Sequence, residues 1–486
     1  MRAMLDRMPD AIAVHRLARR IAAPCILASV LALLVFAGAA AGSPARSDAT
    51  RAVPTIAGMD DAARWTAAYW IGRAPEADRP LATPDAIARQ NARLLREDPS
   101  MYALAALGPE LQGAQVRGWI EAVSRRPAAA RFDASGRRLA PRSLDRLIDA
   151  LALETIPARQ TTRYGLVVRR AALRTFPTDQ RVFSTPGDTD IDRFQESALF
   201  PGTPVVIAHA SRDGRWLFVV SPRYAAWIDT RDVAEGDAGT VLAYGARAPY
   251  RLVTGATVHT AFTPEAPAVS AVQLDMGTRV PLAVAPAQGP LNGQHPASGH
   301  AVELPVRDGA GRLVLHPALL PRSADTADGP LPLTRRHLIG QAFKFLGERY
   351  GWGHDYNARD CSGFVSEVYA SMGLVLPRNT GDQAGSPVLS VDRLGDAAHR
   401  DVAMGALEVG DLVYVPGHVM MVIGYADGEP FVIHDIHGGG QRGTGGDVVR
   451  LGLNGVVVTS LRGLVFDDGT PYVDRATAIV RPADVR

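Results

Sequence analysis

The spacing of hydrophobic positions divides the chain into a helical first part, a strand-rich middle and a mixed last part. In "DDAARWTAAYW", Trp65 and Tyr69 stand four apart, which would place both aromatic rings on one face of a helix. Thr83 followed by Pro84 is typical of a helix N-cap and first helical position. We therefore predict a helical region over residues 43–158.

The middle of the chain carries short strand-like runs separated by turn residues. "TPVVIAHASRDGRWLFVVSP" contains the pair Asp213-Gly214 between two such runs, which predicts a β-hairpin. Short strands that close on a tryptophan-containing run resemble a bacterial SH3-type barrel. The stretch "RDGRWLFV" has a weak echo in "RDGAGRLVL". We therefore predict two SH3-like barrels, over residues 159–245 and 246–330.

The last part, residues 331–486, mixes both periods. "TRRHLIGQAFKFLG" and "DCSGFVSEVYASMG" have the helical spacing, and Cys361 falls in the first turn of the second segment. "GDLVYVPGHVMMVIGYADGEPFVIHDIHG" predicts three consecutive strands, over residues 411–415, 418–424 and 431–435. We predict an α+β domain here.

The N-terminus has the pattern of an export signal. Arg19 and Arg20 precede an apolar run that begins at Ile21 and ends near Ala41 in small residues. We expect residues 1–42 to be a signal peptide, with an uncleaved membrane anchor as the alternative, because the run is almost long enough to span a bilayer. With either a signal peptide or an anchor, we expect export to the periplasm or cell envelope. We expect contact with a membrane only through this segment.

Charge and cysteine content narrow the function. The 52 basic and 50 acidic residues give a net charge of +2 without a basic patch, so we expect no nucleic-acid partner. The chain has 2 cysteines, and Cys361 is the one that remains after removal of the signal. Exported cysteines usually pair. An unpaired one is either an inert buried thiol or a reactive group.

The position of Cys361 favours a reactive group. The unpaired N–H groups and the dipole at a helix start stabilise an anion, so we expect a lowered thiol pKa. A nucleophilic thiol also needs a base. His418 directly follows the turn Pro416-Gly417 at the start of a strand. There its side chain can reach the start of the cysteine helix.

These segments together resemble a known enzyme family. "RYGWGHDYNARDCSGFV", "GDLVYVPGHVMMVIG" and "FVIHD" are similar to the NlpC/P60 cysteine peptidases, over about the last third of the chain. The resemblance implies an α+β fold: a papain-like catalytic domain preceded by two SH3-like β-barrels and a helical N-terminal region. It implies a peptidase that hydrolyses the γ-D-Glu–diamino acid bond of peptidoglycan stem peptides, acting on short fragments with a free N-terminal L-Ala.

By this resemblance, Cys361 is the nucleophile, His418 the general base and acid, and His434 the residue that orients His418. Tyr350 matches a family tyrosine beside the developing oxyanion. Two further sets are expected to contact substrate: Asp360 and Ser362, which would bind the free ammonium, and Thr380 and Tyr224, which would line or wall the groove. Asp360 is also a candidate N-cap of the Cys361 helix. No cofactor or metal is expected.

Two features depart from the family pattern. The usual Trp-Gly-Gly is Trp352-Gly353-His354 here, and we expect His354 to point into solvent. Counting residues across a two-residue turn at Asp427-Gly428 places His418 opposite His437 rather than His434. A β-bulge near Pro430 would restore His434, so both histidines stay candidates for the third position.

Three other functions are weighed against peptide hydrolysis. Cys361, His418, His434 and His437 are possible zinc ligands, although no C-x-x-C or H-E-x-x-H spacing is present. A non-catalytic SH3 protein that binds the cell wall is a second alternative, but it would not need a Cys–His pair. Amide hydrolysis or acyl transfer on another substrate by the same core is the third.

Overall fold

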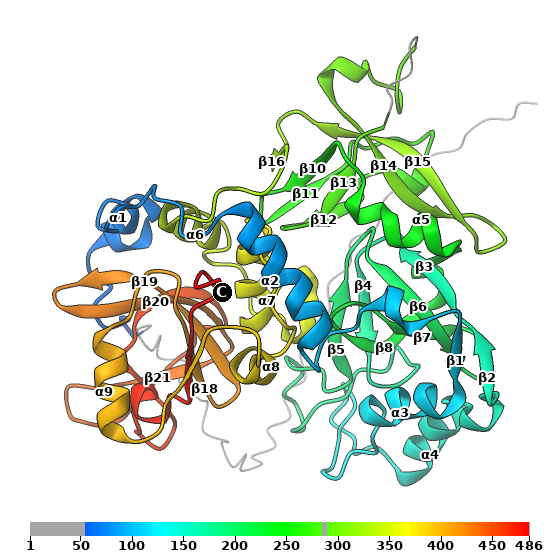
Figure 1. The fold of residues 1–486 in the computed structure, drawn as a ribbon. Helices are drawn as coiled ribbons and strands as arrows, with labels where there is room; N and C mark the ends of the chain where they lie inside the picture. The colour runs from blue at the N-terminus through cyan, green and yellow to red at the C-terminus, as the bar shows by residue number, and fades with distance from the viewer. Residues whose placement is uncertain (1–53, 284–288, 486) are drawn as a thin grey trace, which may run out of the picture. The chain divides into compact units, whose positions relative to one another are not determined.

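The computed structural model describes residues 54–283 and 289–485, so the predicted signal over residues 1–42 lies outside the described residues. Within the described part, no helix is long and apolar enough to cross a membrane. The predicted order is observed: helices come first, then β-rich segments, then a mixed domain (Figure 1). The boundaries between these regions stay predictions.

The last domain is built on a six-stranded antiparallel sheet in the order β17-β25-β18-β19-β20-β23. The three predicted central strands are confirmed as β18 (Leu412–Val415), β19 (His418–Ala426) and β20 (Glu429–Ile436). Helices α6 (Arg335–Phe343) and α7 (Cys361–Ala370) pack on one face. The remaining elements are β17 (Val391–Arg393), β25 (Ala478–Val480), β23 (Gly455–Ser460), α8 (Thr380–Gly385) and α9 (Ala397–Gly405).

A β-bulge interrupts the pairing of β19 with β20. Val422 and Gly424 both pair with β20, and Ile423 between them is left without a partner in the ladder. Gly424 has φ +142°, which glycine adopts without steric strain. The extra residue inverts the alternation of side chains along the rest of β19.

The bulge decides which histidine shares a face with His418. Because of the inversion, His418 and His434 lie on the same face of the sheet, and His437 lies one residue beyond the end of β20. The alternative with a bulge near Pro430 is the one observed. The extra residue is Ile423 on β19, opposite Phe431 and Val432.

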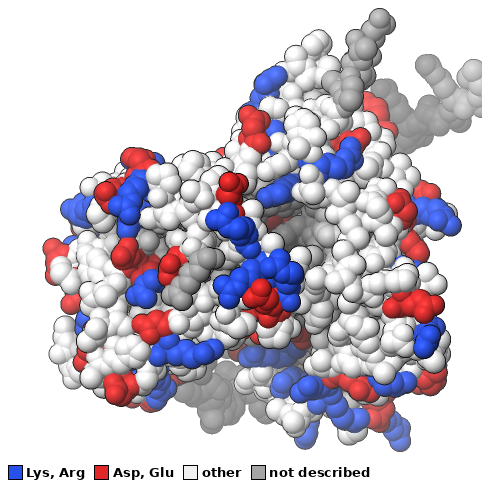
Figure 2. Space-filling view, in the orientation of Figure 1, with Lys and Arg blue, Asp and Glu red and all other residues white. Residues whose placement is uncertain are grey.

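The helices of the N-terminal region pack into two different hydrophobic cores. Trp70 of α1 (Ala67–Ile71) and Leu94 of α2 (Pro84–Glu97) are fully buried in the core of the last domain. Helices α3 (Gly113–Val123) and α4 (Pro141–Ala150) instead pack on the first barrel. The basic side chains at the centre of Figure 2 lie over α2, with acidic side chains among them.

One local prediction in this region holds and one does not. Thr83 caps α2 by accepting a hydrogen bond from the N–H of Ala86 at 3.3 Å. Trp65 and Tyr69 do not share a helix, because Thr66 is extended at φ −121° and separates a 3-10 turn from α1. Thr66 caps α1 with its hydroxyl, which ends the first element and starts the second.

The first barrel is a seven-stranded antiparallel sheet in the order β5-β4-β8-β7-β6-β3-β9. The hairpin predicted at Asp213-Gly214 is confirmed between β6 and β7, and Trp227 is fully buried in the barrel core. The strands are β3 (Arg163–Val167), β4 (Ala171–Arg174), β5 (Gln195–Leu199), β6 (Pro204–Ala210), β7 (Trp216–Val220), β8 (Ala225–Asp229) and β9 (Val233–Gly236).

The second block is also β-rich. Its described strands form three small antiparallel sheets around one core that includes Val253, Leu274, Val302 and Leu320. The strands are β10 (Tyr250–Val253), β11 (Thr257–His259), β12 (Gln273–Asp275), β13 (Arg279–Pro281), β14 (Gly299–Arg307), β15 (Leu313–Pro321) and β16 (Thr326–Ala327).

Candidate active site

Cys361 is the first residue of α7, as the sequence predicted. The carboxylate of Asp360 caps this helix by accepting a hydrogen bond from the N–H of Gly363 at 2.8 Å, which confirms its expected N-cap role. The thiol is buried at 5% exposure, and the backbone N–H of Val419 lies beside its sulfur. The start of β19 therefore lies directly against the thiol.

Burial governs the protonation of Cys361. Desolvation, with the neighbouring Asp360 carboxylate, raises the pKa of the thiol to about 12, and the Val419 N–H opposes this shift without reversing it. The lowered pKa that we expected from the helix start is wrong, because removal of water outweighs the helix dipole here. The resting group is a thiol.

His418 is the first member of a chain of three side chains. Its Nε2 lies 2.8 Å from Nδ1 of His434, and Nε2 of His434 lies 3.0 Å from the hydroxyl of Thr459 on β23. When Thr459 accepts, Nδ1 of His434 is unprotonated and accepts from Nε2–H of His418. This tautomer leaves Nδ1 of His418 with a free lone pair, as a base requires.

Thiol and imidazole are both neutral at rest. Burial lowers the pKa of His418 to about 4, so it is unprotonated at neutral pH. A proton moving from Cys361 to His418 creates a thiolate and an imidazolium together. Each new charge then compensates the other, and no net charge is added to the buried site.

The pKa of His418 predicts the acid side of the activity profile. The base is neutral above its pKa of about 4 and is lost as the pH falls through that value. We expect kcat/KM to be nearly constant from about pH 6 to 8 and to fall tenfold per pH unit well below pH 4. Initial rates in buffers of constant ionic strength test this, and an acid limb centred near the ordinary histidine pKa would contradict it.

His437, the alternative partner, makes other contacts. Its Nε2 lies 3.0 Å from a carboxylate oxygen of Asp190, and its ring packs edge-on against Tyr350 at 5.9 Å between centroids. The structure thus places His434, and not His437, at hydrogen-bond distance from His418.

Tyr350 borders a cleft beside the histidines. It is 7% exposed, and burial, with nearby Cys361 and Asp360, raises the pKa of its phenol far above the usual value. The phenol is therefore a permanent O–H donor close to the thiol. The cleft has a volume of about 630 Å³ and is lined by Tyr350, Pro416, Gly417, His418, Ile436, His437, Gly438, Gly439, Arg450, Leu451, Val465, Phe466, Asp467, Asp468, Tyr472 and Arg475.

Asp435 is a buried carboxyl group that the sequence did not point to as functional. It follows His434 on β20, so it faces the opposite side of the sheet. Neither carboxyl oxygen has a hydrogen-bond partner within residues 54–283 and 289–485. Burial raises its pKa well above the usual value, and the group lies close enough to Cys361 to add to the raised pKa of the thiol.

The side chains of Asp360 and Ser362 are already hydrogen-bonded within the protein, to Arg378. Arg378 donates to both oxygens of Asp360, at 3.1 and 2.8 Å, and to the hydroxyl of Ser362 at 2.9 Å. Although burial opposes it, Arg378 holds the pKa of Asp360 below its usual range. A substrate ammonium could reach Asp360 only by displacing Arg378, so the ammonium-binding role stays a prediction.

The other two predicted substrate residues lie apart from the cleft. Tyr224 donates to Glu196 at 2.6 Å and lines a cavity of about 140 Å³ with Arg378, where the first barrel meets α7. Thr380 is the first residue of α8 and is half-buried. Their contacts with substrate stay predictions.

His354 is buried, so the expected orientation into solvent is wrong. It is 4% exposed, its Nε2 lies 3.0 Å from Glu367, and its Nδ1 accepts from Arg378 at 2.9 Å. Burial and the Arg378 charge lower its pKa well below the usual value, so it is neutral. The side chain supports the loop before Cys361.

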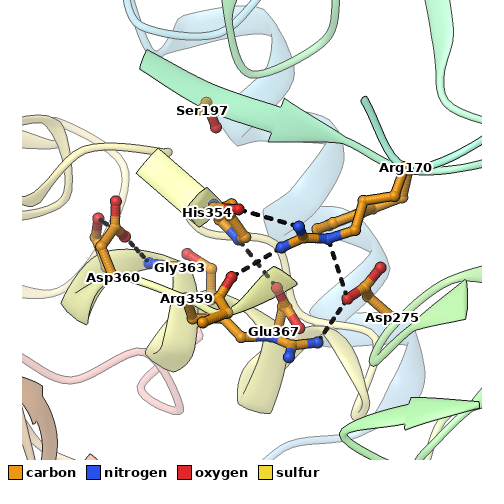
Figure 3. Close-up of polar contacts among 12 residues, drawn as sticks. Arg170, Ser197, Asp275, His354, Arg359, Asp360, Gly363 and Glu367 are labelled. Atoms are coloured by element: carbon orange, nitrogen blue, oxygen red, sulfur yellow. Dashed lines mark hydrogen bonds and ion pairs between the residues drawn. The ribbon is translucent and has the colours of Figure 1, made fainter. Parts of the chain in front are cut away.

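A buried charge network joins this loop to the first barrel and to the second β-rich block (Figure 3). Arg170 of the first barrel donates to the carbonyl of His354 at 3.0 Å and pairs with Asp275 of the second block at 3.4 Å. Arg359 pairs with Asp275 at 2.7 Å and with Glu367 of α7 at 2.9 Å. Three parts of the chain therefore hold the start of α7 together.

Comparison with known proteins agrees with this site. The model of the NlpC/P60 family matches residues 347–443, and that of the SH3 domain (SH3b1 type) matches residues 181–229. The last domain therefore matches the NlpC/P60 family, whose members are cysteine peptidases, and the first barrel matches an SH3 domain.

Individual relatives match this chain over different parts of its length. Over 107 residues it is 36% identical to a "Probable endopeptidase p60" of Listeria seeligeri and 37% identical to that of Listeria welshimeri. These matches cover 21% of this chain and 20% of each relative, so it spans about a fifth of their length. A solved NlpC/P60 endopeptidase from Photobacterium damselae subsp. piscicida shares the fold, with TM-score 0.67, 16% identity, and coverage of 86% of this chain and 97% of that chain.

The zinc alternative requires several ligand side chains that converge on one point. Within the described residues, no group of three or more His, Cys, Asp or Glu side chains has an arrangement able to hold a metal ion. His418 and His434 instead contact one another through ring nitrogens.

Proposed function

We propose that this protein is an exported cysteine endopeptidase that hydrolyses the γ-D-Glu–diamino acid bond of peptidoglycan stem peptides. One observation carries the proposal: the Val419 N–H contacts the Cys361 sulfur at a helix start, and the adjacent His418 lies 2.8 Å from His434. Relatives described as probable endopeptidases support the reaction class. The signal predicted over residues 1–42 supports a substrate in the cell envelope.

Each side chain has a step in the proposed reaction. Nδ1 of His418 takes the Cys361 proton as the sulfur attacks the amide carbon of the substrate. Tyr350 donates its O–H to the oxyanion that forms. The carbon–nitrogen bond then breaks, and His418 gives its proton to the leaving amine. A water molecule, deprotonated by His418, hydrolyses the thioester and restores the thiol.

The first barrel supports a preference for short substrates. The Arg223 side chain donates to Ser366 of α7 at 2.9 Å and to the carbonyl of Pro377 at 3.3 Å. Trp352 donates to the carbonyl of Gln195 at 3.0 Å. The barrel thus covers the side of α7 away from the histidine cleft. We infer that the substrate chain is short on the N-terminal side of the acyl residue D-Glu. This favours turnover fragments with a free N-terminal L-Ala.

Peptide hydrolysis tests the proposal directly. The purified protein is incubated with L-Ala-γ-D-Glu-meso-diaminopimelate, and the products are identified by mass spectrometry. We expect L-Ala-D-Glu and free diaminopimelate. An N-acetylated peptide is expected to react at least roughly tenfold more slowly if the barrel limits substrate length. Cleavage at another bond, or none, would contradict the function, and equal rates for both peptides would contradict only the length limit.

His434 is expected to act through His418. In His434→Ala, Nε2–H of His418 loses its acceptor and the productive tautomer is no longer favoured, so kcat should fall by roughly 10- to 100-fold with KM little changed. Thr459→Val removes the acceptor at the end of the chain, and a smaller loss of kcat is expected. Steady-state kinetics of both variants test this. Equal activity of His434→Ala and wild type, or a fall in His437→Ala instead, would contradict the assignment.

A further inference from the structure

One loop of the first barrel reaches the rim of the active-site cleft. This loop joins β4 to β5 and contains Asp190, whose side chain is 20% exposed. Tyr356 of the last domain donates its O–H to the carbonyls of Thr189 and Asp190, at 3.3 and 2.7 Å. These hydrogen bonds hold the backbone of the loop against the last domain, and they do not need the carboxylate of Asp190.

The carboxylate of Asp190 accepts hydrogen bonds from three side chains of the last domain. One of its oxygens lies 3.0 Å from Nε2 of His437 and also accepts from the side-chain amide of Asn454 at 3.0 Å. The other oxygen accepts from the guanidinium of Arg349. Although burial opposes it, Arg349 holds the pKa of Asp190 below its usual value, so the group is an anion at neutral pH. Because an ionised carboxylate can only accept, it favours the tautomer of His437 that carries a proton on Nε2.

The three residues that Asp190 binds all border Tyr350. Arg349 directly precedes it in the chain. The backbone carbonyl of Asn454 accepts from the N–H of Tyr350 at 3.2 Å. The ring of His437 packs edge-on against the ring of Tyr350. One carboxylate of the first barrel therefore joins the groups that hold the backbone and the ring of this tyrosine.

The hydroxyl of Tyr350 depends on these neighbours for its direction. Within residues 54–283 and 289–485 this hydroxyl makes no hydrogen bond, so the packing around the ring decides where the O–H can reach. In the proposed reaction it donates to the oxyanion. Such a donor is effective only when it lies about 2.7–3.1 Å from the place where the charge develops. A small displacement of the ring would therefore weaken the stabilisation of the transition state.

We propose that Asp190 is a positioning residue for Tyr350, through which the first barrel contributes to catalysis by the last domain. This inference rests on the proposed function, in which Tyr350 donates to the oxyanion. Asp190 does not itself line the cleft, and it acts through His437 and Asn454. The barrel then has a second role besides limiting the length of the substrate, because it completes the setting of the oxyanion donor.

Steady-state kinetics of Asp190 variants test the inference. On L-Ala-γ-D-Glu-meso-diaminopimelate, kcat of Asp190→Ala should fall roughly tenfold with KM little changed, because the oxyanion forms only after the substrate has bound. Asp190→Asn keeps one oxygen acceptor and should lose less. Asp179→Ala is the matched control, because Asp179 lies in the same loop, is 70% exposed and pairs with Arg215 of the barrel at 3.1 Å. Wild-type kcat in folded Asp190→Ala would overturn the inference.

A second substitution separates positioning from a general structural effect. Tyr350→Phe removes the hydroxyl, so in that background Asp190→Ala should cause little further loss of kcat. A contribution that does not act through Tyr350 would instead reduce kcat by the same factor in both backgrounds. Equal factors would therefore overturn the assignment. Circular dichroism should show that the variants are folded, because Tyr356 still holds the loop, and the same cycle with Asp190→Asn decides the question if Asp190→Ala is unstable.

The position of Tyr350 can also be observed without turnover. The protein is labelled with 3-fluorotyrosine, and the fluorine NMR signal of Tyr350 is identified by its absence in Tyr350→Phe. This signal should shift or broaden in Asp190→Ala and stay unchanged in Asp179→Ala. If wild type hydrolyses no peptide but the signal moves, the hydrolytic function is wrong and the positioning stands. If wild type hydrolyses the peptide and Asp190→Ala changes neither kcat nor the signal, the function stands and the positioning is wrong.

Discussion

Replacement of Cys361 by alanine is expected to abolish hydrolysis of L-Ala-γ-D-Glu-meso-diaminopimelate, with kcat/KM reduced by at least roughly 10⁴-fold. The sulfur forms the covalent intermediate, and within the described residues no second cysteine is present to replace it. His418 and Tyr350 would remain, but neither supplies a nucleophile with comparable reactivity. Product release followed by chromatography measures the loss.

The fold should survive this change. Alanine keeps the helical backbone at the start of α7, and the Asp360 cap depends on the Gly363 N–H rather than on the thiol. Circular dichroism and the thermal midpoint of Cys361→Ala should therefore match wild type closely. Cys361→Ser is the matched control for loss of the thiol, because it keeps a hydroxyl group, a less reactive nucleophile, at the same position. Normal turnover by folded Cys361→Ala would refute the mechanism.

The second large effect is expected at Arg359, on stability rather than chemistry. The Arg359 and Asp275 side chains are both 0% exposed, and Arg359 also pairs with Glu367 and Glu348. Arg359→Met keeps much of the volume but removes the cation that pairs with Glu367 and Glu348 and leaves Asp275 with Arg170 alone. We expect the free energy of unfolding to fall by roughly 3–5 kcal/mol at pH 8. Urea unfolding followed by tryptophan fluorescence measures this.

The loss at Arg359 should depend on pH in a defined direction. Burial already raises the pKa of Asp275 to about 6 and raises that of Glu367, even with Arg359 present. Without Arg359 these values rise further, so the carboxyls become neutral as the pH falls and the penalty shrinks. The difference from wild type should be smaller at pH 5 than at pH 8. R215M, which removes a 59% exposed partner of Asp179, is the control and should change stability by less than about 1 kcal/mol.

Local signals in the sequence predicted much of the site. The helix that begins at Cys361, the tight turn before His418 and the three strands around it each depend on residues close together in the chain. The cap at Thr83 and the hairpin at Asp213-Gly214 held for the same reason. These features are decided by turn residues and hydrophobic spacing, which a single sequence displays directly.

What the sequence did not show depends on contacts between distant segments. The pKa of Cys361 follows from depth of burial, and the helical period alone says nothing of depth. His354 is buried because Arg378 and Glu367 converge on it from other elements. Gly424 was the one available signal for the bulge, since an isolated glycine inside a strand favours such a break. It would have placed the bulge on β19 and favoured His434 over His437.

Helices α1 and α2, which lie far from the last domain in the sequence, supply part of its hydrophobic core. Trp70 packs against Phe431 at 5.1 Å between ring centroids, and Leu94 is buried in the same core. A fragment that starts at Thr334 would expose the apolar slot that Trp70 fills and would be prone to self-association. The domains follow one another in the sequence as if they were independent. The last domain moved alone into another protein would nevertheless lack the part of its hydrophobic core that α1 and α2 supply.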